Sequence, residues 1–240
     1  MVLRIPVGDV RVIKPYVGGG FGPKCEATPL EMSSALLAGI TGKPVKMTYS
    51  REQVFHHCRA RHQFYAEMSL GVMRDGTMVA LKNKAVLDGG AYTSFGIATV
   101  YYAGSLLGGP YKLRAMKYDG YRVYTNKPAC GAQRGHGGVA HRAAFEQLVD
   151  MTAAKLEMDP IEMRLKNVMA AGDVTINELD MSSLGMRECI EAVRDGSDWK
   201  NKKGKLPKGK GIRMACGFFV SGAATPSIVR TRTTPRWLSS

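Results

Sequence analysis

The sequence lacks long apolar runs. No stretch of its 240 residues approaches the roughly 20 consecutive apolar residues of a membrane-spanning helix. The first eight residues also lack the basic start, the apolar stretch and the small-residue cleavage site of a secretory signal. We therefore expect a soluble, cytoplasmic protein with no membrane span.

Cysteine is scarce and scattered. The five cysteines include no Cys-x-x-Cys pair, and the five histidines do not recur with Cys or carboxylate partners at metal-ligand spacing. This pattern argues against a structural zinc site and a disulfide framework, and it favours a reducing compartment. No metal site built from protein side chains is predicted.

Acidic residues are few: 20 Asp and Glu stand against 34 Lys and Arg, which gives a formal net charge of +14. Such a balance is typical of proteins with anionic partners, including nucleic acids. However, residues 198–240 hold ten of the basic residues and a single acidic one. The densest part, Lys200–Lys210, mixes Lys with Gly and Pro, so it indicates a solvated linker. A nucleic-acid-binding arm is the alternative, but no nucleic-acid motif accompanies it.

The pattern of apolar residues predicts a mixed α+β fold, with hairpins and βα units in one compact body. Alternation over Asp9–Tyr16 predicts a strand that leads into a glycine loop, and a capping box at Thr28–Glu31 predicts a helix that ends at Gly42. Further strands are predicted at Lys43–Tyr49, Phe64–Val72, Met78–Leu87, Tyr118–Tyr124 and Gly211–Val220, and further helices at Ala140–Leu156, after Asp159 and at Gly185–Val193.

The first glycine loop, Gly18–Lys24, fits neither common nucleotide-binding template. The dinucleotide fingerprint requires Gly where Pro23 stands, and the Walker loop requires Ser or Thr where Cys25 stands. Four glycines around Phe21 still let bare backbone approach a bulky ligand and present N–H groups to it. A simple tight turn is the alternative.

The second glycine loop, Cys130–Gly138, leads directly into a predicted helix. The N–H groups at the start of that helix, together with Arg134, would suit an anionic or strongly polar group. His136 lies between two glycines and is expected to face whatever fills the loop, although a lone histidine is often an ordinary surface residue.

These two loops resemble two loop motifs in the molybdenum-cofactor-binding subunit of the xanthine dehydrogenase and aldehyde oxidase family. The markers are Gly-Gly-Gly-Phe-Gly-x-Lys at Gly18–Lys24 and Arg-Gly-x-Gly-Gly at Arg134–Gly138. The stretch Met163–Asn167, followed by Gly172-Asp173, is also similar to that family. Within the family, residues 118–126 and 130–137 most resemble the 4-hydroxybenzoyl-CoA reductases.

The resemblance implies that a pterin dithiolene holds molybdenum, in the cytosine dinucleotide form of molybdopterin. It implies FAD and [2Fe-2S]/[4Fe-4S] clusters on partner subunits of a dimerised heterotrimer. The cofactor-binding residues carried over from the family are Gly20, Phe21 and Gly22 in the first loop and Ala132, Gln133, Arg134 and Gly135 in the second.

The resemblance also implies a substrate. Xanthine dehydrogenases contact a purine from three positions. In this sequence those positions hold Cys25, with Glu26 next to it, then Tyr102, and then His136. Tyr102 and His136 instead match the 4-hydroxybenzoyl-CoA reductase pattern, which implies an aroyl-CoA thioester that loses its ring hydroxyl. Both are candidate catalytic proton donors or hydrogen-bonding partners. For Tyr102, a core tyrosine in an apolar helix is the alternative.

Family subunits are several times longer than this chain, and their catalytic glutamate has no counterpart here. We therefore expect a piece of such a subunit, inactive alone: a first molybdopterin-binding domain at 1–197, a Lys/Gly-rich linker at 198–210, the start of a strand region at 211–224 and a tail unlike the family at 225–240. A reading-frame break or a truncated gene would explain the tail. A hydroxylase acting on another aromatic, N-heterocyclic or aldehyde substrate and a non-catalytic basic binding module remain as alternatives.

Overall fold

The computed structural model describes residues 3–219, which divide into two compact units. The first unit holds residues 3–64, 86–100 and 121–137, and the second holds residues 65–85, 101–120 and 138–219. This division differs from the single body that the sequence predicts. Its physical reason is that the large cluster of buried apolar side chains belongs wholly to the second unit.

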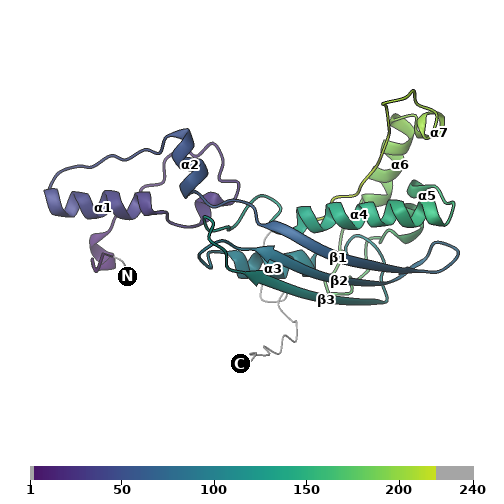
Figure 1. The fold of residues 1–240 in the computed structure, drawn as a ribbon, viewed down its shortest axis with the longest axis horizontal. Helices are drawn as coiled ribbons and strands as arrows, with labels where there is room; N and C mark the ends of the chain where they lie inside the picture. The colour runs from purple at the N-terminus through teal and green to yellow at the C-terminus, as the bar shows by residue number, and fades with distance from the viewer. Residues whose placement is uncertain (1–2, 220–240) are drawn as a thin grey trace. The chain divides into compact units, whose positions relative to one another are not determined.

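A capping box starts the first long helix, α1, which spans Pro29–Thr41 (Figure 1). The Thr28 N–H donates to Glu31 Oε2 over 2.7 Å, and Gly42 ends the helix in the left-handed conformation with φ 63°. This confirms the helix predicted from the capping-box pattern. No residue of α1 is buried, and Leu36 and Ile40 remain 52% and 71% exposed.

Three short helices complete the N-terminal part of the first unit. The 3-10 helices η1 and η2 span Val7–Asp9 and Pro23–Cys25, and α2 spans Arg51–His57. The apolar pattern does not predict α2, although Ser50 and Gln53 form a second capping box at its start.

The sheet has three strands in the order β1-β2-β3, namely Gln63–Val72, Met78–Asp88 and Ala115–Val123. The Met73 N–H donates to the Thr77 carbonyl over 2.9 Å and closes the predicted hairpin between β1 and β2. The predicted strands at these three places are thus confirmed, with ends shifted by a few residues.

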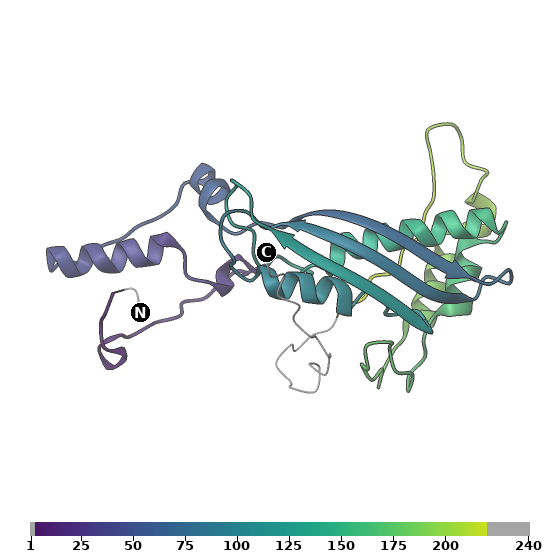
Figure 2. The same cartoon turned by 60° about the horizontal axis from the view of Figure 1, so that its bottom comes forward.

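The pairing of β2 with β3 is parallel. The Arg114 N–H donates to the Val79 carbonyl at one end, and the Gly89 N–H donates to the Val123 carbonyl at the other. Parallel strands require a crossover connection, and α3, Gly96–Ser105, lies in it. The mixed α+β class predicted from the sequence is therefore confirmed (Figure 2).

Four helices surround the core of the second unit. α4 spans Gly138–Lys155, α5 spans Pro160–Asn167, α6 spans Met186–Gly196 and α7 spans Trp199–Lys202, and consecutive helices pack together. Side chains from β2, α4 and α5 meet in this core, including Leu81, Phe145, Val149, Ile161 and Met163, all at most 1% exposed.

The buried carboxylate of Glu146 accepts hydrogen bonds from three segments of the second unit. Glu146 of α4, 3% exposed, accepts hydrogen bonds from Tyr111 Oη at 2.9 Å, Arg164 Nε at 2.9 Å and the Cys216 N–H at 3.0 Å. Arg164 of α5 also binds Asp150 over 2.7 Å. Because both charges are buried, each needs the other and the surrounding hydrogen bonds.

Three predicted strands are not strands in the described residues. Segments 9–16 and 43–49 form no hydrogen-bonded strand pairing. In the first segment, Asp9 ends the 3-10 helix η1 and Val10 is extended. Alternation alone cannot make a strand, because the backbone N–H and C=O groups need a neighbouring strand. Residues 211–219 likewise form no strand, and Val220 lies outside the described residues, as does the predicted tail at 225–240.

Among the described residues, no helix is long and apolar enough to cross a membrane.

Candidate functional site

The first glycine loop is a tight turn that closes on itself. Gly19, Phe21 and Gly22 have φ values of 155°, 51° and 100°. Lys24 Nζ donates to the Gly19 carbonyl over 2.7 Å, and the Cys25 N–H donates to the Gly22 carbonyl over 2.9 Å. The side chain of Phe21 is 59% exposed beside the turn.

The second glycine loop lies directly against the first. The Arg134 N–H donates to the Phe21 carbonyl over 2.9 Å, and the Arg134 guanidinium carbon lies 5.9 Å from the centre of the Phe21 ring. A Cβ atom on Gly22 would lie 2.5 Å from the Ala132 carbonyl oxygen and 2.8 Å from the Gln133 nitrogen. The structure therefore brings together the two loops that the sequence places about a hundred residues apart.

Residues just before β1 hold the second loop in place. Ala60 and Cys130 form a parallel bridge, and the Gly131 N–H donates to the Ala60 carbonyl over 3.1 Å. Arg61 Nη2 donates to the Arg134 carbonyl over 2.5 Å. The second loop is thus held at its start by the backbone of Ala60 and at its middle by the Arg61 side chain.

Arg122 is a structural centre that no sequence pattern predicts. Its Nη2 donates to the carbonyls of Gly89 and Tyr92, each over 2.7 Å, and its Nε donates to His62 Nε2 over 3.1 Å. A Cβ atom on Gly89 or Gly96 would collide with this guanidinium. No local signal marks Arg122, because its partners are brought together only by the fold.

The hydrogen bond from Arg122 determines the protonation state of His62. Only a neutral imidazole with an unprotonated Nε2 can accept this bond. Burial, followed by the positive charge of Arg122, lowers the pKa of His62 to about 4, while Asp88 opposes the shift. His62 is therefore neutral near pH 7.

His136 and Glu26 both adjoin Phe95 in the first unit. The His136 ring lies 6.1 Å from the Phe95 ring, and burial lowers the pKa of His136 below its ordinary value. The Glu26 carboxylate accepts a hydrogen bond from the Phe95 N–H over 2.9 Å. Cys25 is exposed at the end of η2.

Tyr102 belongs to the second unit, on the C-terminal half of α3. Its ring centre lies 5.6 Å from that of Tyr101 and 6.4 Å from that of Phe219. It is partly buried among aromatic side chains, an environment compatible with both a core tyrosine and an active-site tyrosine.

The paired loops present backbone N–H groups that a polar ligand such as a pterin could bind. Among residues 3–219, the backbone N–H groups of Gly20, Ala132, Gln133 and Gly135 donate to no other group of the chain. Such N–H groups can bind ring and phosphate oxygens. Within the same described range, no group of three or more His, Cys, Asp or Glu side chains could hold a metal ion directly.

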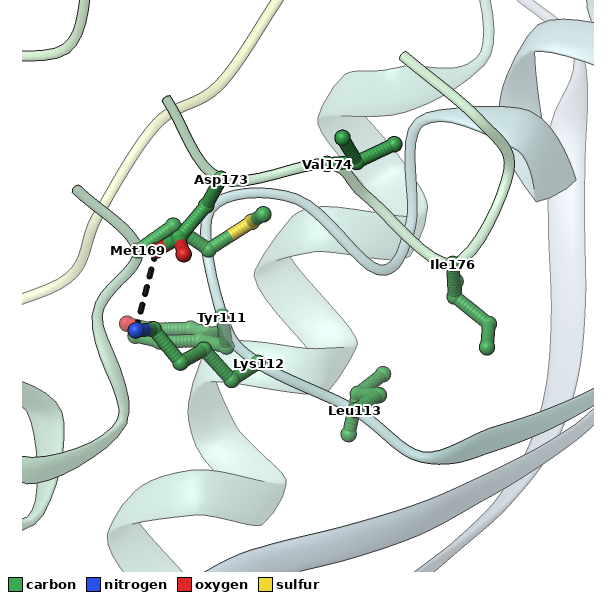
Figure 3. Close-up of a pocket in the computed structure, with 7 residues that line it drawn as sticks. All are labelled: Tyr111, Lys112, Leu113, Met169, Asp173, Val174 and Ile176. Atoms are coloured by element: carbon green, nitrogen blue, oxygen red, sulfur yellow. Dashed lines mark ion pairs between the residues drawn. The ribbon is translucent and has the colours of Figure 1, made fainter. Parts of the chain in front are cut away.

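A separate small pocket of about 200 Å³ lies in the second unit and contains none of the predicted site residues. Figure 3 shows the ion pair at this pocket, in which Lys112 Nζ lies 2.9 Å from Asp173 Oδ2. Its lining is Tyr111, Lys112, Leu113, Met169, Asp173, Val174 and Ile176.

Known proteins are similar to this chain in sequence over part of their own length. The xanthine dehydrogenase molybdenum-binding subunit of Escherichia coli O157:H7 is 36% identical over 227 residues, which cover 91% of this chain and 30% of that subunit. The nicotinate dehydrogenase large molybdopterin subunit of Eubacterium barkeri is 34% identical over 195 residues, which cover 81% of this chain and 46% of that subunit.

A solved structure agrees with these relatives. The aldehyde oxidoreductase from Desulfovibrio gigas is similar with a TM-score of 0.74 and 28% identity, over 80% of this chain and 21% of that protein. The chain therefore spans less than half the length of each of these three proteins. Residues 1–168, which include both glycine loops, match the family model described as the molybdopterin cofactor-binding domain. The chain thus belongs to this family, as the molybdopterin-binding domain of a xanthine dehydrogenase/aldehyde oxidase-type large subunit.

Proposed function

We propose that this chain is the molybdenum-cofactor-binding part of an oxidoreductase. The observation that carries the proposal is the contact of the two glycine loops at Gly22. Four backbone N–H groups of these loops have no acceptor in the described chain. A bound molybdenum cofactor supplies a redox centre that exchanges two electrons and an oxygen atom with a substrate.

The chain's own residues hold and orient the cofactor in this proposal. Phe21 and Gly22 form the floor of the site, and the N–H groups of Ala132 and Gln133 bind the pterin. Arg134 keeps the loops closed through its bond to the Phe21 carbonyl. Its cationic side chain, stacked near the Phe21 ring, can also bind a phosphate of a dinucleotide form of the cofactor.

For the substrate we propose a 4-hydroxybenzoyl-CoA-like aroyl-CoA, whose ring hydroxyl is removed reductively. The support is the resemblance at Tyr102 and His136, with Cys25 beside the first loop. Burial lowers the pKa of His136, which favours the neutral imidazole, and this form can accept or donate a hydrogen bond at the leaving oxygen. The Tyr102 hydroxyl is the proposed proton donor.

A hydroxylase acting on an N-heterocycle or an aldehyde is the second candidate. It is supported by the relatives, whose names state xanthine, nicotinate and aldehyde as their substrates. Under either proposal the molybdopterin is the cytosine dinucleotide form. An FAD subunit and an iron–sulfur subunit join the chain in a cytoplasmic heterotrimer, and two heterotrimers form a dimer.

The two candidates differ in the direction of electron flow. The complex that contains this chain should be purified and supplied with 4-hydroxybenzoyl-CoA and a reduced low-potential donor. Formation of benzoyl-CoA is the expected result. Absence of benzoyl-CoA, together with dye reduction by nicotinate or an aldehyde, would favour the hydroxylase. Absence of both pterin and molybdenum from the purified complex would contradict either proposal.

A further inference from the structure

Glu26 follows η2 at the exit of the first glycine loop, and both of its carboxylate oxygens are engaged. Oε1 accepts hydrogen bonds from Ser94 Oγ at 2.6 Å and from the Phe95 N–H at 2.9 Å. Oε2 lies 3.5 Å from Arg59 Nε. The side chains of Glu26 and Arg59 are only 19% and 20% exposed, so this ion pair is largely shielded from water.

The partners of Glu26 reach the start of the second glycine loop. A Cβ atom on Gly131 would lie 2.5 Å from Ser94 Oγ and 3.1 Å from Arg59 Cβ. Ser94 and Arg59 thus pack against the backbone one residue before Ala132. On its other side, the Ser94–Phe95 turn begins α3, and Ser94 has a left-handed φ of 46°.

We propose that Glu26 is a positioning residue that holds the two glycine loops in register, in place of the substrate contact that the family resemblance implies for it. This inference rests on the proposed cofactor-binding function. One carboxylate joins the exit of the first loop to the two side chains that support the second loop. Hydrogen bonds to a charged acceptor are stronger than neutral ones, so losing the charge weakens all three contacts together.

The contacts also explain why a carboxylate is needed. A glutamine at position 26 can still accept from Ser94 and Phe95 through one oxygen, but its NH2 group would face the Arg59 guanidinium, which has no acceptor. An alanine would leave Arg59 without a counter-ion beside Gly131. We therefore expect a graded effect, with Glu26→Ala more severe than Glu26→Gln.

The test compares Glu26→Gln and Glu26→Ala with Glu31→Gln as the matched control. Glu31 also binds a backbone N–H in the first unit, but it caps α1 at Thr28 and touches neither loop. In the purified protein we would measure the amide resonance of Phe95 and the rate of proteolytic cleavage within residues 18–26 and 130–137. Neither measurement requires bound cofactor.

We expect Glu26→Gln to move the Phe95 amide proton upfield and to speed cleavage in both loops about tenfold, with a larger increase for Glu26→Ala. Glu31→Gln should leave both loops as protected as in the parent. Equal protection in Glu26→Ala and the parent, or faster cleavage in the first loop alone, would overturn the proposal.

Kinetics of the complex separate positioning from substrate contact. In Glu26→Gln, pterin content should fall and kcat per chain should fall with it, whereas the substrate KM of the loaded fraction stays unchanged. Full pterin content with a raised KM would show a substrate contact and would overturn the proposal. If the parent complex holds no pterin, the proposed function fails, while the amide shift and the cleavage rates still decide the role of Glu26.

Discussion

At the scale of single residues, Gly22 is a position at which the first glycine loop packs tightly against the second. Its φ of 100° is unfavourable for any residue with a side chain, and a Cβ would meet backbone atoms of Ala132 and Gln133, which cannot rotate away. We expect Gly22→Ala to lower the free energy of unfolding by about 1–3 kcal/mol and to reduce pterin content.

Gly39 offers the matched control for this prediction. It lies inside α1, and a Cβ atom added there would meet no other atom within 4 Å, so Gly39→Ala should stabilise the helix by about 0.5–1 kcal/mol. Denaturant unfolding and pterin analysis of both variants check the pair. Equal effects of the two substitutions on pterin content would contradict the role of Gly22.

His62 makes the first unit sensitive to acid. Its pKa in the folded protein is about 4, below the ordinary value of 6.5, so the folded state favours the neutral imidazole. Its contribution to stability is therefore fully present above pH 6.5 and is lost as the pH falls through about 4. We expect the free energy of unfolding to decrease over this range, measured by denaturant unfolding at several pH values.

The variant His62→Asn tests this assignment, because its Oδ1 can still accept from Arg122 but does not titrate. We expect a weaker dependence on pH between 6.5 and 4 than in the parent. The exposed His56 provides a control, since His56→Asn should retain the parent's profile. An unchanged profile in His62→Asn would assign the acid sensitivity to other groups.

The residues of the site divide into those that the sequence could predict and those that it could not. The two glycine loops could be predicted, because closely spaced glycines beside Phe21 and Arg134 form local patterns. Arg122 and His62 could not, since they are 60 positions apart and only the fold joins them. The contacts of Glu26 with Ser94 and Phe95 are also long-range and leave no local pattern.

At the scale of elements, the buried Glu146 joins α4 to α5 and to the segment at Cys216. Removing Glu146 leaves the buried Arg164 guanidinium with only the Asp150 ion pair, and it takes the carboxylate acceptor away from Tyr111 Oη and the Cys216 N–H. We therefore expect Glu146→Ala to lower the free energy of unfolding by about 3–5 kcal/mol. Glu162→Ala, at an exposed position of α5, should cost much less, and thermal or denaturant unfolding of both variants measures the difference.

Local signals account for the elements that the sequence predicts correctly. α1 and α5 start at side chains that bind the first backbone N–H groups, and the β1–β2 hairpin has an Asp-Gly turn. Apolar periodicity does not predict α3, because its residues are nearly all apolar or small and show no amphipathic period; only the apolar helix given as an alternative for Tyr102 corresponds to it. The strand predicted at Lys43–Tyr49 fails for the opposite reason, since it has the right composition and no neighbour in the described chain.

At the scale of the whole molecule, the excess of basic residues is concentrated toward the C-terminal end of the sequence. Lys200 and Lys202 belong to the short α7, and Lys203 Nζ lies 5.0 Å from the Trp199 ring centre, so part of the predicted linker is folded. The remaining lysines form an exposed charged segment with no base-reading motif.

We expect any DNA binding by this chain to be weak and non-specific. Retention on immobilised DNA at about 50 mM salt should disappear by about 200 mM, because it depends on released counter-ions. Replacing Lys205, Lys208 and Lys210 with Gln should remove the retention at about 50 mM salt as well. Replacing Lys112, Lys117 and Lys155 instead gives a variant of equal charge for comparison. Sequence-dependent retention at the higher salt concentration would favour the basic binding module.

The guanidinium of Arg122 between Gly89 and Gly96 has a consequence for the evolution of this domain. The three positions form one steric unit, because a side chain at either glycine occupies the space that the guanidinium fills. Substitution at one position therefore changes which residues are tolerated at the other two. Among related sequences, loss of the arginine should accompany larger residues at the glycine positions, and laboratory libraries that vary the three codons together should recover folded combinations that single substitutions miss.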